Sequence, residues 1–195
     1  RNIIFILLVL LFHYNSQKRL HYKQQHNILK KPLYDIMHNF LGEFKNESYN
    51  KIFCTGKFAL ADSLSTVVTN FVIIYLIYYK KIKIISDSLF TLAILFLLRS
   101  ICFSLTTLPT PKNCNKPPFI TGGCGDLMFS GHYIWFTIAL YIIIKKTKID
   151  ILLKSFFVIL FIISIISTLM CKNHYSIDIF ISILISYTIS LLIIK

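Results

Sequence analysis

The stretch ILLKSFFVILFIISIISTLM at residues 151–170 decides the fold class. Lys154 is its one charged residue, and nearly all of the other side chains are apolar. Because an α-helix rises about 1.5 Å per residue, a helix over this stretch is as long as the hydrocarbon core of a bilayer is thick, roughly 30 Å. We therefore expect the chain to cross a membrane here as a helix.

Apolar runs recur along the rest of the chain, over residues 58–79, 89–108, 125–144 and 177–194, with a shorter run over residues 3–12. The shorter run cannot span a bilayer alone. Since the chain starts at Arg1 without Met, we interpret this run as the end of a first span whose beginning is missing. A signal-peptide core is the alternative, but no small-residue cleavage site follows it. The sequence thus predicts an all-α, polytopic membrane protein with six transmembrane helices, the first truncated, in a single domain over residues 1–195.

The composition excludes the main classes of soluble basic protein. The 195 residues carry a formal net charge of +13, yet 55% are hydrophobic and 15% are charged. A nucleic-acid module this basic is normally polar, and a disordered chain lacks this hydrophobicity. We therefore expect no nucleic-acid partner, and we expect the basic residues of the first loop to meet the head groups of membrane lipids.

The positions of the lysines orient the predicted spans. By parity, the links after the second and fourth spans lie on one side of the membrane. Both are rich in lysine, namely Lys80, Lys81 and Lys83 in the first and Lys145, Lys146, Lys148 and Lys154 around the second. Basic residues in short links favour the cytoplasmic side. Residues 13–57, 109–124 and 171–176 then share the lumenal or external face, although the first of these loops also carries eight Lys or Arg against three acids.

One segment on that face is His174-Tyr175-Ser176-Ile177-Asp178. His174 and Asp178 are four residues apart, so on a helix they share one face. The carboxylate can hold one imidazole nitrogen as a donor and leave the other as a nucleophile. The same spacing also fits a purely structural hydrogen bond.

The other segment is CGDLMFSGH at residues 124–132. Ser130 and Gly131 fall where a helix is expected to begin, and the free backbone N–H groups of a helix start bind phosphate well. His132 follows them, although a lone His at a span entrance is more often interfacial than catalytic. Arg99, inside a predicted span, is either functional or balances the charge of Asp62 or Asp87.

Together these segments resemble the sphingomyelin synthase family, which are six-span relatives of the lipid phosphate phosphatases with a PAP2-like helical core. The resemblance rests on Cys-Gly-Asp-x-x-x-Ser-Gly-His at residues 124–132 and His-Tyr-Ser-x-Asp at residues 174–178. Residues 32–35 are similar to the family's Pro-Leu-x-Asp motif, and residues 99–109 to its third-span motif ending in Thr-Leu-Pro. One departure is Tyr133, because the family usually has Thr there.

The resemblance implies a two-step transfer without metal or cofactor. His174, oriented by Asp178, would attack the phosphorus of phosphatidylcholine, and His132 would protonate the departing diacylglycerol. The primary hydroxyl of ceramide would then take the head group from the phosphohistidine and give sphingomyelin. Further residues are expected to bind substrate: Asp126, Ser130, Gly131, Arg99 and Tyr175.

Other functions stay open at this point. The donor can equally be phosphatidylethanolamine, which gives ceramide phosphoethanolamine. In a lipid phosphate phosphatase, water would resolve the phosphohistidine, but no Lys-x6-Arg-Pro motif precedes the Ser-Gly-His segment. A non-catalytic lipid-binding membrane protein is the third alternative. The resemblance implies a multi-pass protein of the secretory pathway, in the Golgi, plasma membrane or endoplasmic reticulum, with its active site on the lumenal or external face.

The cysteines and the other histidines complete the predictions. Four cysteines are expected near the external face, where disulfides form: Cys54, Cys114, Cys124 and Cys171. Cys114–Cys124 is the pair to test first, and free thiols are equally compatible with the sequence. Cys102 lies within a span and should be unpaired. The remaining histidines are interpreted as solvated or interfacial residues of the first loop: His13, His21, His26 and His38.

Overall fold

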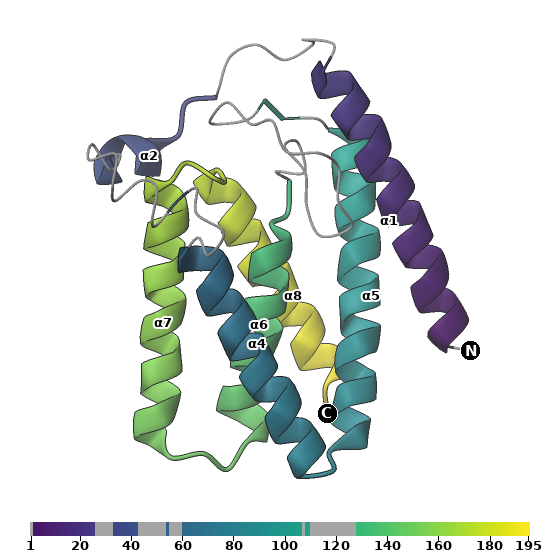
Figure 1. Cartoon of the computed structure of the whole chain (residues 1–195), viewed down its shortest axis with the longest axis vertical. Coiled ribbons are helices and arrows are strands. Elements are labelled where there is room, and N and C mark those ends of the chain that lie inside the picture. The colour runs from purple at the N-terminus through teal and green to yellow at the C-terminus, as the bar shows by residue number, and fades with distance from the viewer. Residues whose placement is uncertain (1, 26–32, 43–53, 55–59, 107, 110–127) are drawn as a thin grey trace.

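The computed structural model describes residues 2–25, 33–42, 54, 60–106, 108–109 and 128–195, which form seven α-helices and no strand (Figure 1). The helices are α1 (Asn2–Gln25), α2 (Ile36–Leu41), α4 (Leu60–Tyr78), α5 (Ile82–Leu105), α6 (Gly131–Lys146), α7 (Ile151–Met170) and α8 (Ser176–Ile193). The all-α prediction is confirmed for these parts of the chain.

Three of these helices, α5, α7 and α8, are long and apolar enough to cross a membrane. This finding indicates an integral membrane protein. Shorter apolar stretches lie in α1 and α4, at Ile3–Ser16 and Ser63–Tyr78. The other predicted crossings, and hence the total of six, remain a prediction.

Several predicted helix boundaries were wrong. The run over residues 125–144 corresponds to α6, which begins only at Gly131, after Ser130 at the N-cap position. This is where the Ser-Gly pair predicts a helix start. α5 begins at Ile82 rather than at residue 89, because the helix continues through polar residues such as Asp87. α1 likewise extends beyond its apolar run to Gln25.

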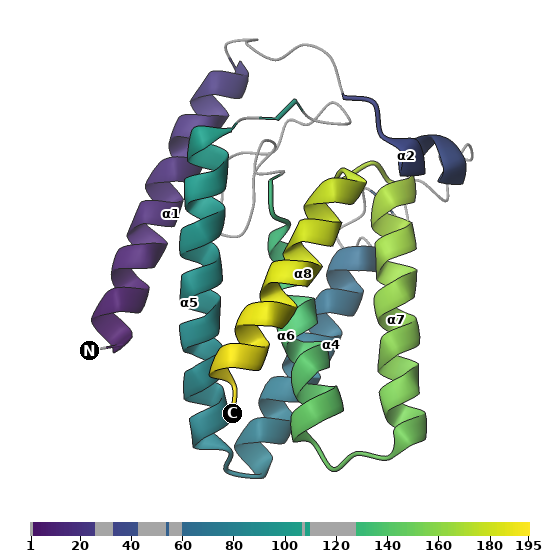
Figure 2. The same ribbon diagram turned by 180° about the vertical axis from the view of Figure 1, so that it is seen from behind.

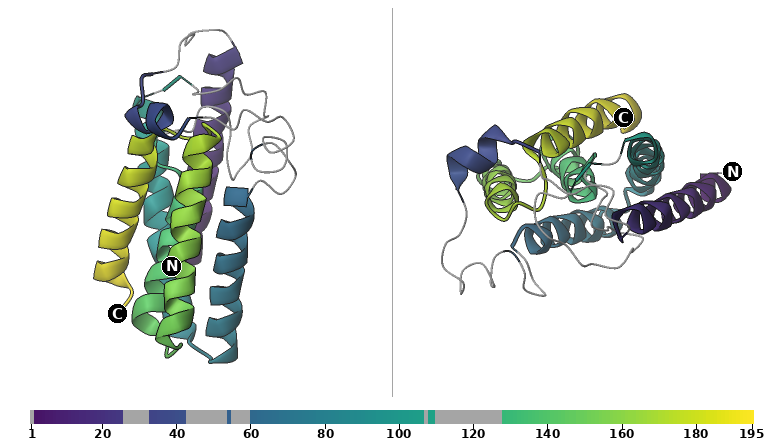
Figure 3. Two further views of the ribbon diagram at one scale, coloured as in Figure 1. Left: turned by 90° about the vertical axis from the view of Figure 1, so that its left-hand side faces the viewer. Right: turned by 90° about the horizontal axis from the view of Figure 1, so that it is seen from above.

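The core of the bundle is α6, which packs against α4, α5, α7 and α8 (Figure 3). This helix is apolar around most of its circumference, as expected for a central helix, and most of its residues are buried. α1 lies along α5 at the edge of the bundle (Figures 1 and 2). The packing therefore places the start of α6 between the other helices.

α8 packs against α6 and α5 and carries a buried row of small polar residues. Asp178, Ser182, Ser186 and Ser190 follow each other at intervals of four and are all fully buried. Serine side chains allow two helix backbones to come close in a membrane. The residues just before α8 and just before α6 meet where His174 contacts Ser130.

The first loop returns to this same end of the bundle. α2 contacts α7 and α8, and a disulfide bond joins Cys54 to Cys171, whose Cα atoms are 5.2 Å apart. α2 and Cys54 of the first loop therefore lie at the same end of the bundle as residues 171–176, and the side of the membrane that this end faces stays a prediction. Cys102 is a free thiol, as predicted. The suggested partners Cys114 and Cys124 lie outside the described residues.

Candidate active site

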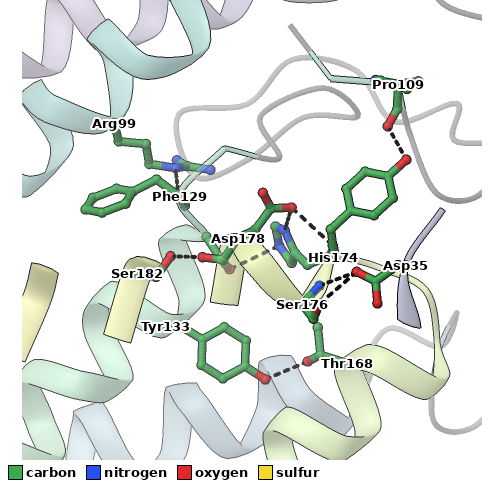
Figure 4. A network of polar contacts seen from close by, with 12 residues as sticks. Asp35, Arg99, Pro109, Phe129, Tyr133, Thr168, His174, Ser176, Asp178 and Ser182 are labelled. Carbon is green, nitrogen blue, oxygen red and sulfur yellow. Dashed lines mark hydrogen bonds and ion pairs between the residues drawn. The ribbon is translucent and has the colours of Figure 1, made fainter. Parts of the chain in front are cut away.

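The two predicted motif segments meet at the ends of α6 and α8 (Figure 4). His174 lies in the short turn between α7 and α8, and its Nε2 is 3.1 Å from the Oγ of Ser130. Both residues are buried, with 9% of His174 and none of Ser130 exposed. Ser130 stands at the N-cap position of α6, but its hydroxyl faces His174 and makes no capping bond. Ser130 and His174, which are 44 residues apart in the sequence, thus lie in one polar cluster.

Asp178 lies behind the His174 ring, and it is completely buried. Its Oδ2 is 3.9 Å from His174 Nδ1 and accepts a hydrogen bond from the backbone N–H of Tyr175 at 3.1 Å. A separation of 3.9 Å is an ion-pair distance and is too long for a hydrogen bond. The reason is that α8 begins at Ser176, so His174 precedes the helix and does not share its regular i, i+4 geometry.

His174 and Asp178 each have a buried polar atom that could take part in a closer contact. Nδ1 of His174 and Oδ1 of Asp178 are buried, and neither has a hydrogen-bond partner among the described residues. A movement of about 1 Å would bring the ring and the carboxylate into hydrogen-bond range. Contacts of this kind often tighten only when substrate is bound.

Arg99 reaches the start of α6 from α5. It is 1% exposed, and its Nε donates to the carbonyl oxygen of Phe129 at 2.7 Å. Phe129 has a left-handed backbone with φ of 78°, which is uncommon for a bulky residue. A Cβ atom added to Gly131 would lie 3.2 Å from one terminal guanidinium nitrogen of Arg99. Glycine at this position therefore lets a cation lie against the first turn of α6.

His13 extends this cluster to α1. Its Nδ1 is 2.7 Å from Ser100 Oγ, and its Nε2 is 3.4 Å from Arg99 Nη1. The Ser100 hydroxyl donates its hydrogen to the carbonyl of Phe96 at 2.7 Å, so it accepts from His13 Nδ1–H. The ring is then the Nδ1–H tautomer, and Nε2 accepts from the guanidinium.

The interpretation of His13 and His38 as solvated or interfacial residues was wrong. His13 is 0% exposed and His38 is 7% exposed. His13 is enclosed because α1 continues as a helix past its apolar run and packs on α5. His38 is enclosed because α2 folds over the turn that carries His174, whose carbonyl oxygen lies 2.9 Å from His38 Nε2. Composition identified a polar segment here, but not which of its side chains face inward.

The other predicted site residues lie in different settings. His132 is the second residue of α6 and is exposed, and its carbonyl oxygen accepts from Ser65 Oγ at 3.4 Å. Tyr175 is 2% exposed; its hydroxyl donates to the Pro109 carbonyl at 2.9 Å, and burial raises the pKa of this hydroxyl. Asp126 lies outside the described residues.

Tyr133, the departure from the resembled motif, is accommodated by α7. Its ring is buried, and its hydroxyl donates to Thr168 Oγ1 at 2.8 Å. In the described parts of the chain, no three His, Cys, Asp or Glu side chains gather into a group that could hold a metal ion. The clustered groups are therefore an imidazole, a carboxylate, a hydroxyl and a guanidinium.

A comparison with protein families gives a match over the C-terminal part of the chain. Residues 123–194 match the family model described as PAP2 superfamily C-terminal. The matched stretch contains Ser130, His132, His174 and Asp178. It indicates a lipid enzyme of the phosphatase or phosphotransferase type. A search of curated proteins gives no match.

Proposed function

We propose that this protein transfers a phosphocholine head group from phosphatidylcholine to ceramide, through a phosphohistidine on His174. The observation that supports the proposal best is the position of His174 Nε2, which is 3.1 Å from Ser130 Oγ at the start of α6. The hydroxyl can donate to Nε2, which then carries the lone pair needed for attack, while Nδ1 carries the proton toward Asp178.

The donor phosphate would bind where Arg99 meets the first turn of α6. A guanidinium and the free N–H groups of a helix start both favour a phosphate anion. Arg99 is held there by its hydrogen bond to the Phe129 carbonyl, and Gly131 leaves room for the guanidinium because it has no side chain. The phosphorus would then lie beside His174.

In the first step, the Nε2 lone pair of His174 forms a bond to phosphorus, and the bond from phosphorus to the diacylglycerol oxygen breaks. His132 donates a proton to that oxygen, so diacylglycerol leaves as a neutral alcohol. The phosphorylated ring is cationic, and the carboxylate of Asp178 stabilises it. General acid catalysis of this kind contributes about 10²–10⁴-fold, which a poor alkoxide leaving group requires.

In the second step, the primary hydroxyl of ceramide attacks phosphorus and gives its proton to His132. The bond between phosphorus and His174 breaks, which yields sphingomyelin and the starting state of both rings. The exposure of His132 is compatible with a lipid oxygen approaching it from the surface of the bundle. We place this chemistry on the lumenal or external face of a secretory-pathway membrane.

A lipid phosphate phosphatase is the second candidate, because the family match covers that type of enzyme as well. In that reaction water would replace ceramide in the second step. A phosphatidylethanolamine donor is the other variant of the main proposal, with Asp126 at the head-group site.

The test uses membranes containing the full chain, labelled ceramide, and either phosphatidylcholine or phosphatidylethanolamine. Labelled sphingomyelin that depends on phosphatidylcholine is the expected product. His174→Ala should abolish it and His132→Ala should reduce it strongly, whereas Thr188→Ala, on an exposed position of α8, should keep it. Transfer that survives His174→Ala would refute the mechanism, and phosphate release from a lipid phosphate without transfer would establish the phosphatase.

A further inference from the structure

The carboxylate of Asp35 binds the N-termini of two helices at once. Its Oδ1 accepts from the backbone N–H groups of Met37 at 2.9 Å and His38 at 3.2 Å, which caps α2. Its Oδ2 accepts from the backbone N–H of Ser176 at 2.7 Å and from the Ser176 hydroxyl at 2.9 Å. Ser176 is the first residue of α8, so one buried side chain joins the first loop to the helix that carries Asp178.

The environment keeps Asp35 charged. Burial by itself would raise the pKa of this carboxyl, but the hydrogen bonds from Ser176 and His38 outweigh it and hold the pKa below its ordinary value. An anion between two helix N-termini is also stabilised by both helix dipoles. Asp35 is therefore a charged acceptor at neutral pH. Its contacts with Ser176 are drawn in Figure 4.

The residues before Ser176 are held by the same segment. His38 Nε2 lies 2.9 Å from the carbonyl oxygen of His174, and a carbonyl only accepts, so Nε2 is the donor. The His38 ring also stacks on Tyr175, with 5.8 Å between ring centroids. The Tyr175 hydroxyl in turn accepts from the backbone N–H of Leu33 at 2.9 Å. Three consecutive residues, 174 to 176, are thus each fixed by residues 33–38.

This support matters because the His174 ring is weakly held by its own contacts. Its Nδ1 is 3.9 Å from Asp178, and among the described residues only the 3.1 Å contact of the ring with Ser130 is of hydrogen-bond length. The direction of Nε2 is then set mainly by the backbone on either side of His174. That backbone lies in a turn, where no helix ladder fixes it.

We propose that Asp35 and His38 are positioning residues, which clamp the turn around His174 so that Nε2 points at Ser130 and at the phosphate site beside it. This proposal rests on the proposed function, because it assigns a role in the same site. Neither side chain is expected to touch substrate. Their effect passes through the backbone of His174 and Ser176.

The first test compares steady-state head-group transfer by Asp35→Ala, Ser176→Ala, His38→Ala and His38→Gln, with Thr188→Ala as the control. Misplacing a reacting group by 1 Å costs about 10²-fold, so kcat should fall by about that factor in Asp35→Ala while KM for both lipids stays the same. Ser176→Ala keeps the backbone bond to Asp35 and should lose less. The amide of His38→Gln can donate to the same carbonyl and should restore most of the rate lost in His38→Ala.

The second test does not require the transferase activity. Diethyl pyrocarbonate acylates exposed imidazole nitrogens, and mass spectrometry of the peptide reports the rate at His174. The buried wild-type ring should react slowly, and the rate should rise severalfold in Asp35→Ala and His38→Ala but not in His38→Gln or Thr188→Ala. If the wild type shows no transfer but these rates change as stated, the proposed function fails and the positioning role stands.

The opposite results overturn the inference. If Asp35→Ala does not fold, Ser176→Ala and the two His38 variants decide the question. Unchanged kcat and unchanged acylation of His174 in the folded variants would refute the clamp. An equal loss in His38→Ala and His38→Gln would also contradict it, because His38→Gln keeps a donor for the His174 carbonyl and His38→Ala does not.

Discussion

Gly131→Ala is the substitution whose effect follows most directly from the geometry of the site. The new Cβ would lie 3.2 Å from Arg99 Nη1, 3.3 Å from Cζ and 3.5 Å from Nη2, so it would press on the guanidinium. Comfortable contacts between such atoms are about 3.5–4.0 Å, so the guanidinium must shift by a few tenths of an ångström. It cannot shift freely, because its Nε donates to Phe129 at 2.7 Å.

The expected loss of stability is small. A hydrogen bond from a charged group contributes about 1.5–3 kcal/mol, and weakening the bond between Arg99 and Phe129 without breaking it costs only a part of this. Replacing Gly by Ala in a helix returns up to about 1 kcal/mol, so the two terms nearly cancel. The midpoint of thermal unfolding in detergent should therefore move by no more than a few degrees.

The expected loss of activity is larger. If a 1 Å misplacement costs about 10²-fold, a shift of a few tenths at the phosphate site costs roughly 3- to 10-fold in head-group transfer. The discriminating control is the same change in an Arg99→Lys background, where no guanidinium remains to be displaced. There Gly131→Ala should cost no further activity and should be neutral or stabilising. Full activity of the single variant, or an equal penalty in both backgrounds, would refute this reasoning.

Three other predictions concern the elements around the site. Replacing both Cys54 and Cys171 by Ser should lower the thermal midpoint, because the disulfide closes a loop of 117 residues and contributes at most about 5 kcal/mol to the free energy of unfolding. A reductant should lower the midpoint of the wild type but not that of the variant. His13→Leu should cost about 1–3 kcal/mol by denaturant unfolding, because it removes a donor to Ser100 and an acceptor from Arg99 inside a buried cluster, and an unchanged stability would contradict a stabilising role for these two contacts. Because the pKa of Asp35 is lowered in the folded protein, its carboxylate stabilises the fold fully above the unfolded pKa of about 3.9, and this contribution is lost as the pH falls through the lower folded pKa. Asp35→Asn should therefore make the stability depend less steeply on pH in the acid range. Parallel curves of stability against pH for the wild type and the variant would count against the double cap.

The sequence was sufficient to predict a helix and its two ends where a long apolar run is bounded by polar residues. The run over residues 151–170 coincides with α7, whose start is capped by Asp150, and the run over residues 177–194 differs from α8 by one residue at each end. It was insufficient at α1, since the helix continues to Gln25 through residues that no apolar pattern marks.

The sequence indicated which two segments come together at the site, but not which residues hold them in place. Parity of the spans placed the segments of Ser130 and His174 on one face, and the structure joins them. The role of Asp35 as a double cap depends on α2 folding over α8, which no local pattern specifies, although the Pro-Leu-x-Asp motif marked the residue. The pairing of Cys54 with Cys171 likewise required the fold.

The most direct test of the central claim is to detect the covalent intermediate on His174. Membranes containing the chain would receive phosphatidylcholine labelled in its phosphate, without ceramide, and the peptides would then be analysed by mass spectrometry. The account predicts an acid-labile, base-stable phosphocholine group bound through an N–P bond to His174, absent in His174→Ala and removed when ceramide is added. Label on another residue, or transfer to ceramide with no label on His174 at any time, would contradict it.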